Sequence, residues 1–314
     1  MQLEWTNFWS SFLDENKLNG KVREIDSVAS CSTEELCHKI YDDYNYDRLN
    51  CIRKELIYEV ENFPGVHLNT SRVKEIKSLL KKVITKKYKW MMDPDNRYSK
   101  LSPDNYDKTI TDLIGIRFIL SYSGDWKLLH EKIIQRFPYM NDDDYLNDEL
   151  IPIKEDKDFI AEMPQVHYAH GDDLSIYDGE KVKTILSPSG YRSVHYVVCF
   201  RGVYVEIQVR TIFDEAWSNC SHNYVYKHEE NVSYAALLEL SDILCQYTNT
   251  CSELGELMRL IYNDKSVIEK DKKFITTGDI ISRVDHLFDR YSKAHSLITH
   301  FKENLSMKGG EGNE

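Results

Sequence analysis

The sequence has no apolar run that approaches the roughly 20 residues a helix needs to cross a membrane. Its first residues, Met1-Gln2-Leu3-Glu4-Trp5, also lack the basic head and apolar stretch of a secretory signal. Cysteine is sparse, with seven residues and no CxxC pair, which argues against a disulfide framework or a structural zinc site. We therefore expect a cytoplasmic protein without a membrane segment, whose thiols are reduced and mostly buried.

Common nucleotide-binding signatures are also missing. The sequence contains no Walker motif, no GxGxxG fingerprint and no protein-kinase signature. The ATPase and dehydrogenase folds that carry these motifs are therefore set aside. What remains is an ordinary globular composition, with 41% hydrophobic and 29% charged residues in a chain of 314.

Charge is unevenly distributed along the chain. The formal net charge of −12 argues against a protein that binds nucleic acid over its whole surface. Residues 72–100 are nevertheless rich in Lys and Arg, whereas residues 142–180 are strongly acidic. The basic stretch indicates either a local anion site or a solvated helix face, and charge alone does not choose between them.

Hydrophobic periodicity predicts helices at both ends of the chain. Residues 1–65 are expected to be helical, with one apolar stripe on the first helix and a second helix from the capping box Ser32-Thr33-Glu34-Glu35 to a stop near Pro64-Gly65. A third helix is expected over residues 72–89, after a Thr70-Ser71 cap. The further helices that the pattern predicts cover residues 125–136, 212–226, 233–262 and 279–303.

Strands are expected in the middle of the chain. Residues 113–120 are apolar on both faces of the expected strand, as in a central strand that is covered on both sides. Residues 191–200 and 203–211 read as a hairpin around Arg201-Gly202, and pairing Phe200 with Val203 would give paired residue numbers that sum to 403. One hairpin face is then apolar. The opposite face combines Tyr191, Ser193, His195, Glu206, Gln208 and Arg210. Such a varied polar set favours a ligand site over a face that is merely solvated. Residues 139–180 show no clear secondary-structure pattern, and this segment could cover the site.

The basic helix offers a candidate phosphate site. Lys74, Ser78 and Lys82 recur every four residues and would stand in one row, away from the apolar side of the helix. Two ammonium groups and a hydroxyl near a helix start suit a polyphosphate. Arg72 could stack on a base or bind phosphate through its planar guanidinium.

Two carboxylates accompany these groups. Asp112 precedes the central strand, and Glu206 lies on the polar face of the hairpin. Each would bind Mg²⁺ beside phosphates or form an ion pair with Arg117 or Arg210. Together with an aromatic platform, the set describes a nucleotide enzyme that uses Mg²⁺ for phosphoryl-type transfer.

With these residues, the sequence resembles the synthetase domain of RelA/SpoT-type alarmone synthetases, and in particular the small stand-alone members. The resemblance covers about residues 72–227 and rests on four blocks in order. The blocks are Arg72-x-Lys74-xxx-Ser78-xxx-Lys82, Asp112-Leu-Ile-Gly-Ile-Arg117, Gly190-Tyr191-Arg-Ser193-Val-His195, and Glu206-Ile-Gln208-Val-Arg210-Thr211 continuing to Ala216-Trp217, His222 and Tyr226-Lys227. One block could be accidental, but four in sequence are specific.

The resemblance implies an α+β fold, with a mixed, mainly antiparallel sheet of about five strands flanked by helices, as in nucleotidyltransferases. The expected organisation is a helical N-terminal region over 1–65, a synthetase domain over 66–230, C-terminal helices over 231–307 and a flexible tail over 308–314. The same resemblance leaves room for a homo-oligomer built through the C-terminal helices.

The implied activity is transfer of pyrophosphate from ATP to the 3′-hydroxyl of GDP or GTP, which makes ppGpp or pppGpp. By motif, Arg72 would stack on adenine, Lys74, Ser78 and Lys82 would hold the ATP phosphates, and Asp112 and Glu206 would bind Mg²⁺. Glu206 could also take the proton of the attacking hydroxyl. On the acceptor side, Tyr191 would stack on guanine, His195 and Gln208 would lie near the acceptor's phosphates or ribose, and Ser193 would also bind the acceptor. Arg117 on the ATP side and Arg210 on the acceptor side would contact phosphate or carboxylate groups.

Departures from the family pattern leave alternatives open. Ser187 and Ser189 stand where the family has Lys and Asn, and Asn219 and Ser221 stand where close relatives have acids. The acceptor could therefore be the tRNA 3′ end, with Lys86, Lys87 and Lys89 contacting RNA, or an adenine nucleotide. A non-catalytic nucleotide-binding module is disfavoured by the intact carboxylates. The sequence has no His-Asp dipeptide and no block like the family's hydrolase domain, so synthesis without hydrolysis is expected.

Overall fold

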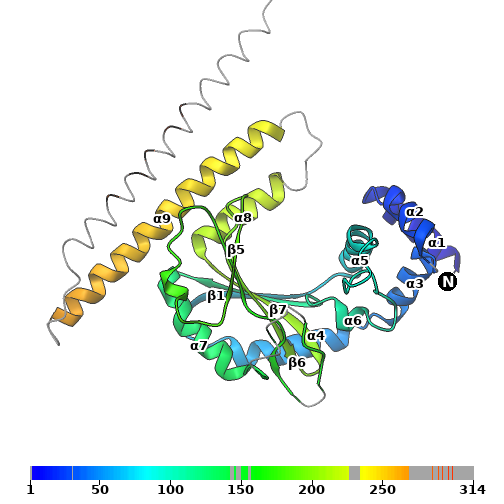
Figure 1. The fold of residues 1–314 in the computed structure, drawn as a ribbon, viewed down its shortest axis with the longest axis horizontal. Coiled ribbons are helices and arrows are strands. Elements are labelled where there is room, and N and C mark those ends of the chain that lie inside the picture. Colours follow the sequence, from blue (N-terminus) through cyan, green and yellow to red (C-terminus); the bar gives the residue numbers. More distant parts are fainter. Residues whose placement is uncertain are drawn as a thin grey trace, which may run out of the picture.

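The computed structural model describes residues 2–268 except 30, 142–144, 146–149, 155–156 and 226–233, with a few single positions beyond 268. The N-terminal region forms four helices, and a seven-stranded sheet follows them (Figure 1). None of the helices in the described part of the chain is both long and apolar enough to span a membrane. Of the predicted helix over 279–303 the structure describes only single positions, and the tail over 308–314 lies outside the described residues.

The N-terminal helices are held together by aromatic side chains. They are α1 (Gln2–Glu15), α2 (Asn19–Val28), α3 (Thr33–Asp43) and α4 (Tyr46–Val60). The stripe predicted for the first helix is confirmed, since Trp5 and Trp9 stack on one another and Phe12 is buried. The predicted second helix is divided into two, because the chain turns between α3 and α4. The Ser32 cap is present, with its side chain accepting from the backbone NH of Glu35.

The sheet is mixed and mainly antiparallel, as expected, but it has seven strands rather than about five. The strand order is β1-β2-β7-β6-β4-β5, and β3 pairs with β6. Among the strands that the structure describes, only the β2–β7 and β4–β5 pairs are parallel. The strands are β1 (Val66–Val73), β2 (Ile114–Leu120), β3 (Phe159–Ile160), β4 (Gln165–Tyr168), β5 (Lys183–Leu186), β6 (Ser193–Phe200) and β7 (Val203–Thr211). Two of the seven strands, β3 and β4, lie in the acidic stretch for which the sequence alone gave no structure.

The predicted hairpin register is confirmed. Phe200 pairs with Val203, and the sum of 403 holds along the whole β6–β7 ladder. The turn residues Arg201 and Gly202 both have positive φ, at 50° and 72°, as a tight two-residue hairpin requires. The apolar face is covered by α7 (Trp126–Arg136), whose Trp126 indole donates to the hydroxyl of the fully buried Tyr196.

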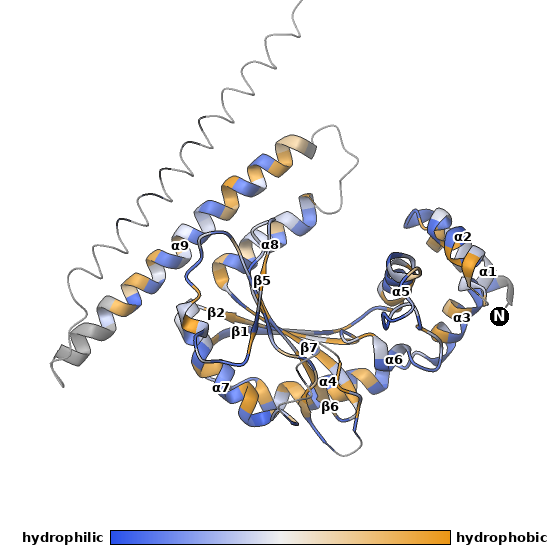
Figure 2. Cartoon of the chain, in the orientation of Figure 1, coloured by the Kyte–Doolittle hydropathy of each residue, from blue (hydrophilic) through white to orange (hydrophobic). Residues whose placement is uncertain are grey.

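Helices lie on both sides of the sheet (Figure 1). On one side are α4 and α7, and on the other is α8 (Ile212–Tyr224), which begins at a complete capping box between Thr211 and Asp214. The long helix α9 (Tyr234–Ile268) packs along α8, and its turns alternate between hydrophobic and hydrophilic (Figure 2). The remaining elements are α5 (Ile76–Trp90), α6 (Tyr106–Thr109), and the short turns η1 (Ser123–Asp125) and η3 (Ser175–Tyr177).

Two sequence-based expectations are wrong in this part of the fold. The helix predicted over 72–89 begins only at Ile76, because residues 66–73 form β1 and pair with β2. Tertiary pairing here overrides a local pattern that also suited a helix. The seven cysteines are all free, but four of them are exposed, so the thiols are not mostly buried.

Candidate functional site

The carboxylate of Asp112 lies between two ammonium groups at the entrance of β2. Its Oδ2 is 2.9 Å from Nζ of Lys74 and 2.8 Å from Nζ of Lys82. Lys74 follows β1 and donates its backbone NH to the carbonyl of Leu113, whereas Lys82 comes from the middle of α5. Burial alone would raise the pKa of Asp112, but the charges of Lys82 and Lys74 hold this pKa below its ordinary value. Asp112 is therefore an ionised carboxylate.

The second carboxylate, Glu206, belongs to the same electrostatic environment. It lies on β7 beside Gly115 of β2. Burial raises the pKa of Glu206, and the negative charge of Asp112 raises it further, while Lys82 and Lys74 act in the opposite direction. The structure thus brings together the two acids and the two lysines that the sequence singled out.

One oxygen atom of this cluster is an unsatisfied hydrogen-bond acceptor. Oδ1 of Asp112 is buried and has no hydrogen-bond partner within the described part of the chain. An unsatisfied buried acceptor costs about 1–3 kcal/mol. The described residues contain no group of three or more His, Cys, Asp and Glu that could hold a metal. Two carboxylates together with phosphate oxygens and water are nevertheless the usual shell of Mg²⁺, so Asp112 and Glu206 fit this ion.

The remaining donor-side residues lie differently from the sequence-based prediction. Arg72 is exposed on β1 rather than in the first turn of a helix, and it pairs in the ladder with Gly115. A Cβ built on Gly115 would be 3.9 Å from Cγ of Arg72, so the arginine side chain extends across this position. Ser78 is exposed in the first turn of α5, one turn before Lys82. The predicted row of three on one helix is thus divided, with Lys74 on the segment that precedes α5.

Five side chains form a closed ring of contacts on the polar face of the hairpin. Nε2 of Gln208 donates to Oε2 of Glu206 at 2.9 Å, and Nη2 of Arg210 donates to Oε1 of Gln208 at 2.7 Å. The same Nη2 donates to the Tyr191 hydroxyl at 2.9 Å, and this hydroxyl is 2.8 Å from Nε2 of His195. Nδ1 of His195 is 3.7 Å from Oε1 of Glu206 and closes the ring.

The ring fixes the tautomer of His195. Because the Tyr191 hydroxyl accepts from Arg210, its own proton is left to donate to Nε2 of His195. The hydrogen-bond network thereby assigns a neutral imidazole with its proton on Nδ1, facing Glu206. Burial and the nearby His167 and Arg210 lower the pKa of His195 to about 3, which agrees with the neutral form. The contacts through His195 therefore fix the position of the Tyr191 side chain relative to that of Glu206.

The arginines Arg117 and Arg210 do not pair with Asp112 or Glu206. Nη1 of Arg117 donates to Glu215 at 2.6 Å, and Nη1 of Arg210 is 3.3 Å from the other oxygen of the same carboxylate. The ion-pair alternative considered from sequence is therefore wrong. Glu215, which the sequence analysis did not identify, lies in the first turn of α8 and anchors both guanidinium groups.

Two other polar residues complete this face. The hydroxyl of Ser193 is buried and donates to the carbonyl of Val209 at 3.2 Å, so it connects the two hairpin strands. His167 of β4 lies opposite Ser193 in the antiparallel ladder, and its ring contacts those of Tyr191 and His195. Sequence reasoning missed His167 because nothing in the acidic stretch indicated that it would form a strand next to β6.

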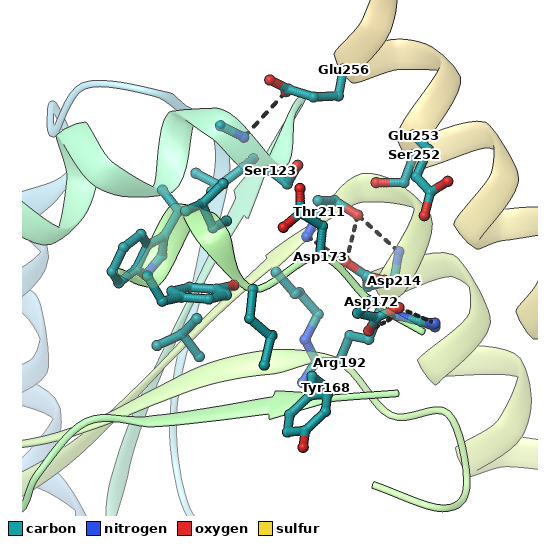
Figure 3. Close-up of a pocket in the computed structure, with 18 of the residues that line it drawn as sticks. Ser123, Tyr168, Asp172, Asp173, Arg192, Thr211, Asp214, Ser252, Glu253 and Glu256 are labelled. Carbon is teal, nitrogen blue, oxygen red and sulfur yellow. Dashed lines mark hydrogen bonds and ion pairs between the residues drawn. The ribbon is translucent and has the colours of Figure 1, made fainter. Parts of the chain in front are cut away.

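Two cavities adjoin the polar face. A small one of about 80 Å³ lies beside Glu206 and His195. A larger one of about 790 Å³ lies at the end of the sheet, between η1, the segment that leads to η3, and α9 (Figure 3). Neither Asp112 nor Glu206 lines the larger cavity, whose lining includes His167 and, from the opposite face of the sheet, Val194.

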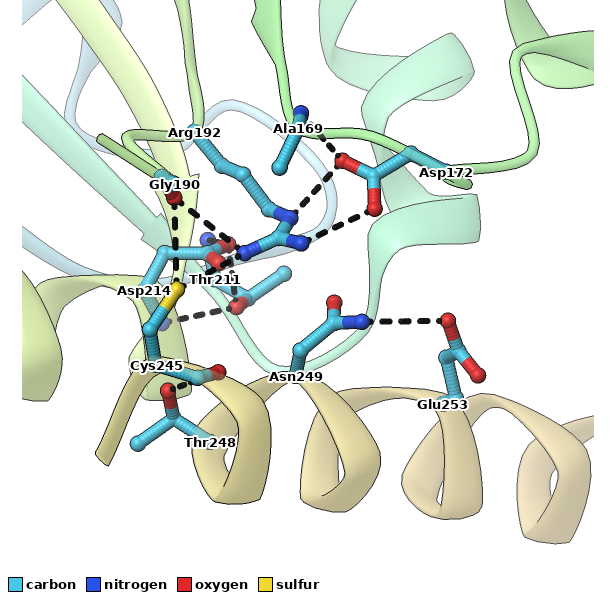
Figure 4. A network of polar contacts seen from close by, with 10 residues as sticks. All are labelled: Ala169, Asp172, Gly190, Arg192, Thr211, Asp214, Cys245, Thr248, Asn249 and Glu253. Carbon is cyan, nitrogen blue, oxygen red and sulfur yellow. Dashed lines mark hydrogen bonds and ion pairs between the residues drawn. The ribbon is translucent and has the colours of Figure 1, made fainter. Parts of the chain in front are cut away.

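A polar network joins the loop before β6 to α9 (Figure 4). Nε and Nη2 of Arg192 donate to the two oxygens of Asp172 at 2.8 and 2.9 Å. Nη1 of Arg192 is 3.4 Å from Sγ of Cys245 on α9, and this thiol is 3.6 Å from the carbonyl of Gly190. The helix therefore supports the two residues on either side of Tyr191.

Replacing Gly190 with Ala is expected to lower the free energy of unfolding by about 2 kcal/mol. Gly190 has a φ of +81°, and a Cβ at this position would lie 2.5 Å from Sγ of Cys245. Denaturant titration would measure the loss. Gly179→Ala is the matched control, since Gly179 has a φ of +80° with nothing within 4 Å of its Cβ. Equal losses in the two variants would show that the contact with α9 contributes nothing.

A family model described as the region found in RelA / SpoT proteins matches residues 71–231. The chain is 22% identical over 234 residues to GTP pyrophosphokinase YjbM of Bacillus subtilis (strain 168), and the match covers 72% of this chain and 87% of that protein.

Solved structures with detectable similarity include two synthetase-type proteins. One is the small alarmone synthetase 1 from Bacillus subtilis bound to its product pppGpp, with 21% identity, a TM-score of 0.40, and coverage of 68% of this chain and 88% of that one. The other is a GTP pyrophosphokinase family protein from Streptococcus pneumoniae, with 18% identity, a TM-score of 0.41, and coverage of 82% and 97%.

Proposed function

Since the chain belongs to the RelA/SpoT family, whose model matches just over half of its length, we propose that it is a pyrophosphokinase that transfers pyrophosphate from ATP to the 3′-hydroxyl of GDP or GTP. The observation that carries this proposal is the cluster of Asp112, Lys74 and Lys82 in the electrostatic environment of Glu206. Such a cluster suits a reaction in which charge on phosphate oxygens must be neutralised.

The donor is ATP, placed on the side of β1 and α5. Lys74, Ser78 and Lys82 hold its phosphates, and the exposed guanidinium of Arg72 stacks on its adenine. When phosphate enters, Lys74 and Lys82 exchange part of their contact with Asp112 for the phosphate oxygens. Asp112 and Glu206 hold Mg²⁺, which when bound supplies positive charge to the phosphates.

The acceptor nucleotide lies on the hairpin side, with its base stacked on Tyr191. Its 3′-hydroxyl oxygen attacks the β-phosphorus of ATP, the bond to the α-phosphate oxygen breaks, and AMP leaves. Glu206 takes the hydroxyl proton, for which its raised pKa makes it better suited than an exposed carboxylate. The ring of contacts through Gln208 and His195 keeps this carboxylate oriented toward the acceptor.

A nucleotide acceptor is favoured over the tRNA alternative by the state of Lys87, one of the three lysines considered for RNA contact. Lys87 donates to the carbonyls of Ser99 and Leu101, both at 3.1 Å, and burial lowers its pKa. It is therefore engaged within the protein rather than presented to RNA. We further propose synthesis without hydrolysis, because the sequence contains no His-Asp dipeptide.

The proposal is tested by incubating the protein with γ-labelled ATP, Mg²⁺ and, separately, GDP, GTP, ATP or tRNA, followed by chromatography. Label is expected on GDP or GTP. Label on tRNA alone would replace the proposed acceptor, and label on ATP alone would indicate an adenosine alarmone. Transfer that continues in excess EDTA would contradict the role given to Mg²⁺.

Replacing Tyr191 with Ala is expected to raise the KM for the acceptor about 5- to 100-fold, because a stacked base is worth roughly 1–3 kcal/mol. The KM for ATP should change little. Tyr191→Phe is the matched comparison, since it keeps the ring but removes the hydroxyl that links Arg210 to His195. If only the KM for ATP rose in Tyr191→Ala, the two nucleotide sites would be reversed.

A further inference from the structure

His167 is an additional polar side chain on the acceptor side of the site. Its ring centroid is 5.6 Å from that of Tyr191 and 4.7 Å from that of His195. It is half-buried on β4 and shares the polar face because it pairs with Ser193. The imidazole is thus in contact with the ring on which the acceptor base is proposed to stack.

The nitrogen atoms of His167 are available, in contrast to those of its neighbours. Nε2 of His195 contacts the Tyr191 hydroxyl and Nδ1 faces Glu206, while both ends of the Gln208 amide are hydrogen-bonded within the ring of contacts. Among the residues that the structure describes, none forms a hydrogen bond with the imidazole nitrogens of His167, whose backbone pairs with Ser193 and Ile185 in the sheet. Neither of its nitrogens belongs to the buried unsatisfied atoms. The free imidazole of this face is therefore that of His167, with one N–H donor and one acceptor in its neutral form.

The orientation of the ring indicates how it would meet a base. The planes of His167 and Tyr191 are 73° apart. A base stacked on Tyr191 lies parallel to the tyrosine ring, so it would be nearly perpendicular to His167 and could not stack on it. The base and the imidazole could therefore touch only through the edge of at least one ring. The hydrogen-bonding groups of bases and imidazoles lie on these edges.

Space for a ligand exists next to His167. His167 is one of the residues that line the cavity of about 790 Å³ at the end of the sheet, whose volume is in the range of small-molecule binding sites. Tyr168, the next residue on β4, also lines this cavity (Figure 3). A cavity of this volume can accept part of a nucleotide beside His167.

We propose that His167 is a specificity-determining residue for the acceptor, forming a hydrogen bond with the edge of the base that stacks on Tyr191. The inference rests on the proposed function, with Tyr191 as the acceptor platform. It assigns base discrimination to β4, a strand from the acidic stretch, at a site where Ser187 and Ser189 replace the Lys and Asn of the family pattern.

The test compares His167→Phe, which keeps a ring but has no nitrogens, with His167→Gln, which keeps a donor and an acceptor. Initial rates would be measured with GDP, inosine diphosphate and ADP as acceptors at saturating ATP and Mg²⁺. We expect His167→Phe to raise the KM for the preferred acceptor about 10-fold and to reduce its preference over the other two by a similar factor. The kcat and the KM for ATP should stay within about 2-fold, and His167→Gln should recover part of the loss. His170→Phe is the control, since His170 is an exposed histidine of the adjacent turn.

Three outcomes would overturn the inference. Unchanged base preference in His167→Phe would exclude a hydrogen bond to the base. An equal rise in the KM for ATP, or equal losses in His167→Phe and His167→Gln, would show that the residue only supports the fold. If the wild-type protein transferred pyrophosphate to no nucleotide at all, the proposed function itself would fail, and this inference with it; transfer with unchanged preference would remove the inference alone.

Discussion

Replacing Asp112 with Asn is expected to lower kcat by at least ~100-fold, which corresponds to about 3 kcal/mol of transition-state stabilisation. The amide would remove one charged ligand of Mg²⁺ and leave Lys74 and Lys82 without the carboxylate that now lies 2.8–2.9 Å from both. Because these lysines would then be free for phosphate, the KM for ATP should stay constant or fall. Steady-state kinetics with each substrate varied in turn would separate the two effects.

Asp104→Asn is the matched control for this variant. Asp104 is exposed in the loop before α6, so the same chemical change there should leave kcat within about 2-fold. Circular dichroism and thermal unfolding would establish that Asp112→Asn is folded, since two unpaired ammonium groups near one another also reduce stability. Near-normal turnover in a folded Asp112→Asn protein would refute the assignment of this residue to the metal.

Replacing Glu206 with Gln is expected to have a loss of similar size, again at least ~100-fold in kcat. The substitution preserves shape, and the new amide oxygen can still accept from Nε2 of Gln208, so this contact can persist. What disappears is the negative charge that would bind Mg²⁺ and receive the proton of the 3′-hydroxyl. The KM for the acceptor should change far less than kcat, because the stacking surface of Tyr191 is unaffected.

Glu162→Gln provides the comparison for Glu206→Gln. Glu162 lines the same small cavity but forms its ion pair with Arg97, away from the ring of contacts. Its replacement should reduce kcat only a few-fold, through local destabilisation. Losses of the same size in both variants would mean that any missing carboxylate around the cavity disrupts the site, and the proton-accepting role of Glu206 would have to be withdrawn.

The parts of the site that sequence predicted are those that local rules determine. The Arg201-Gly202 turn fixed the register of β6 and β7, and with strict alternation along the strands this placed Tyr191, His195 and Glu206 on one face. The central position of β2 followed from its apolar residues on both faces. In each case the information lies within about twenty residues of sequence.

The parts that sequence missed depend on contacts between distant segments. Arg72 was assigned to a helix because the pairing of β1 with β2 across some forty residues has no local signature. No local pattern around Glu215 indicates that it binds two arginines of different strands. His167 lies beside Tyr191 only because an irregular acidic stretch forms β4. Such pairings are decided by the burial of whole elements rather than by the propensity of single residues.

The central claim is that Asp112 and Glu206 hold one divalent ion between the donor phosphates and the acceptor hydroxyl. A crystal structure with Mn²⁺ in place of Mg²⁺ and a non-hydrolysable ATP analogue would test it through the anomalous signal of manganese. The account predicts one peak within about 2.0–2.3 Å of a carboxylate oxygen of each residue, with phosphate oxygens completing the shell and Lys74 and Lys82 turned toward the phosphates. A nucleotide bound elsewhere, or a metal ion that touches neither carboxylate, would contradict it.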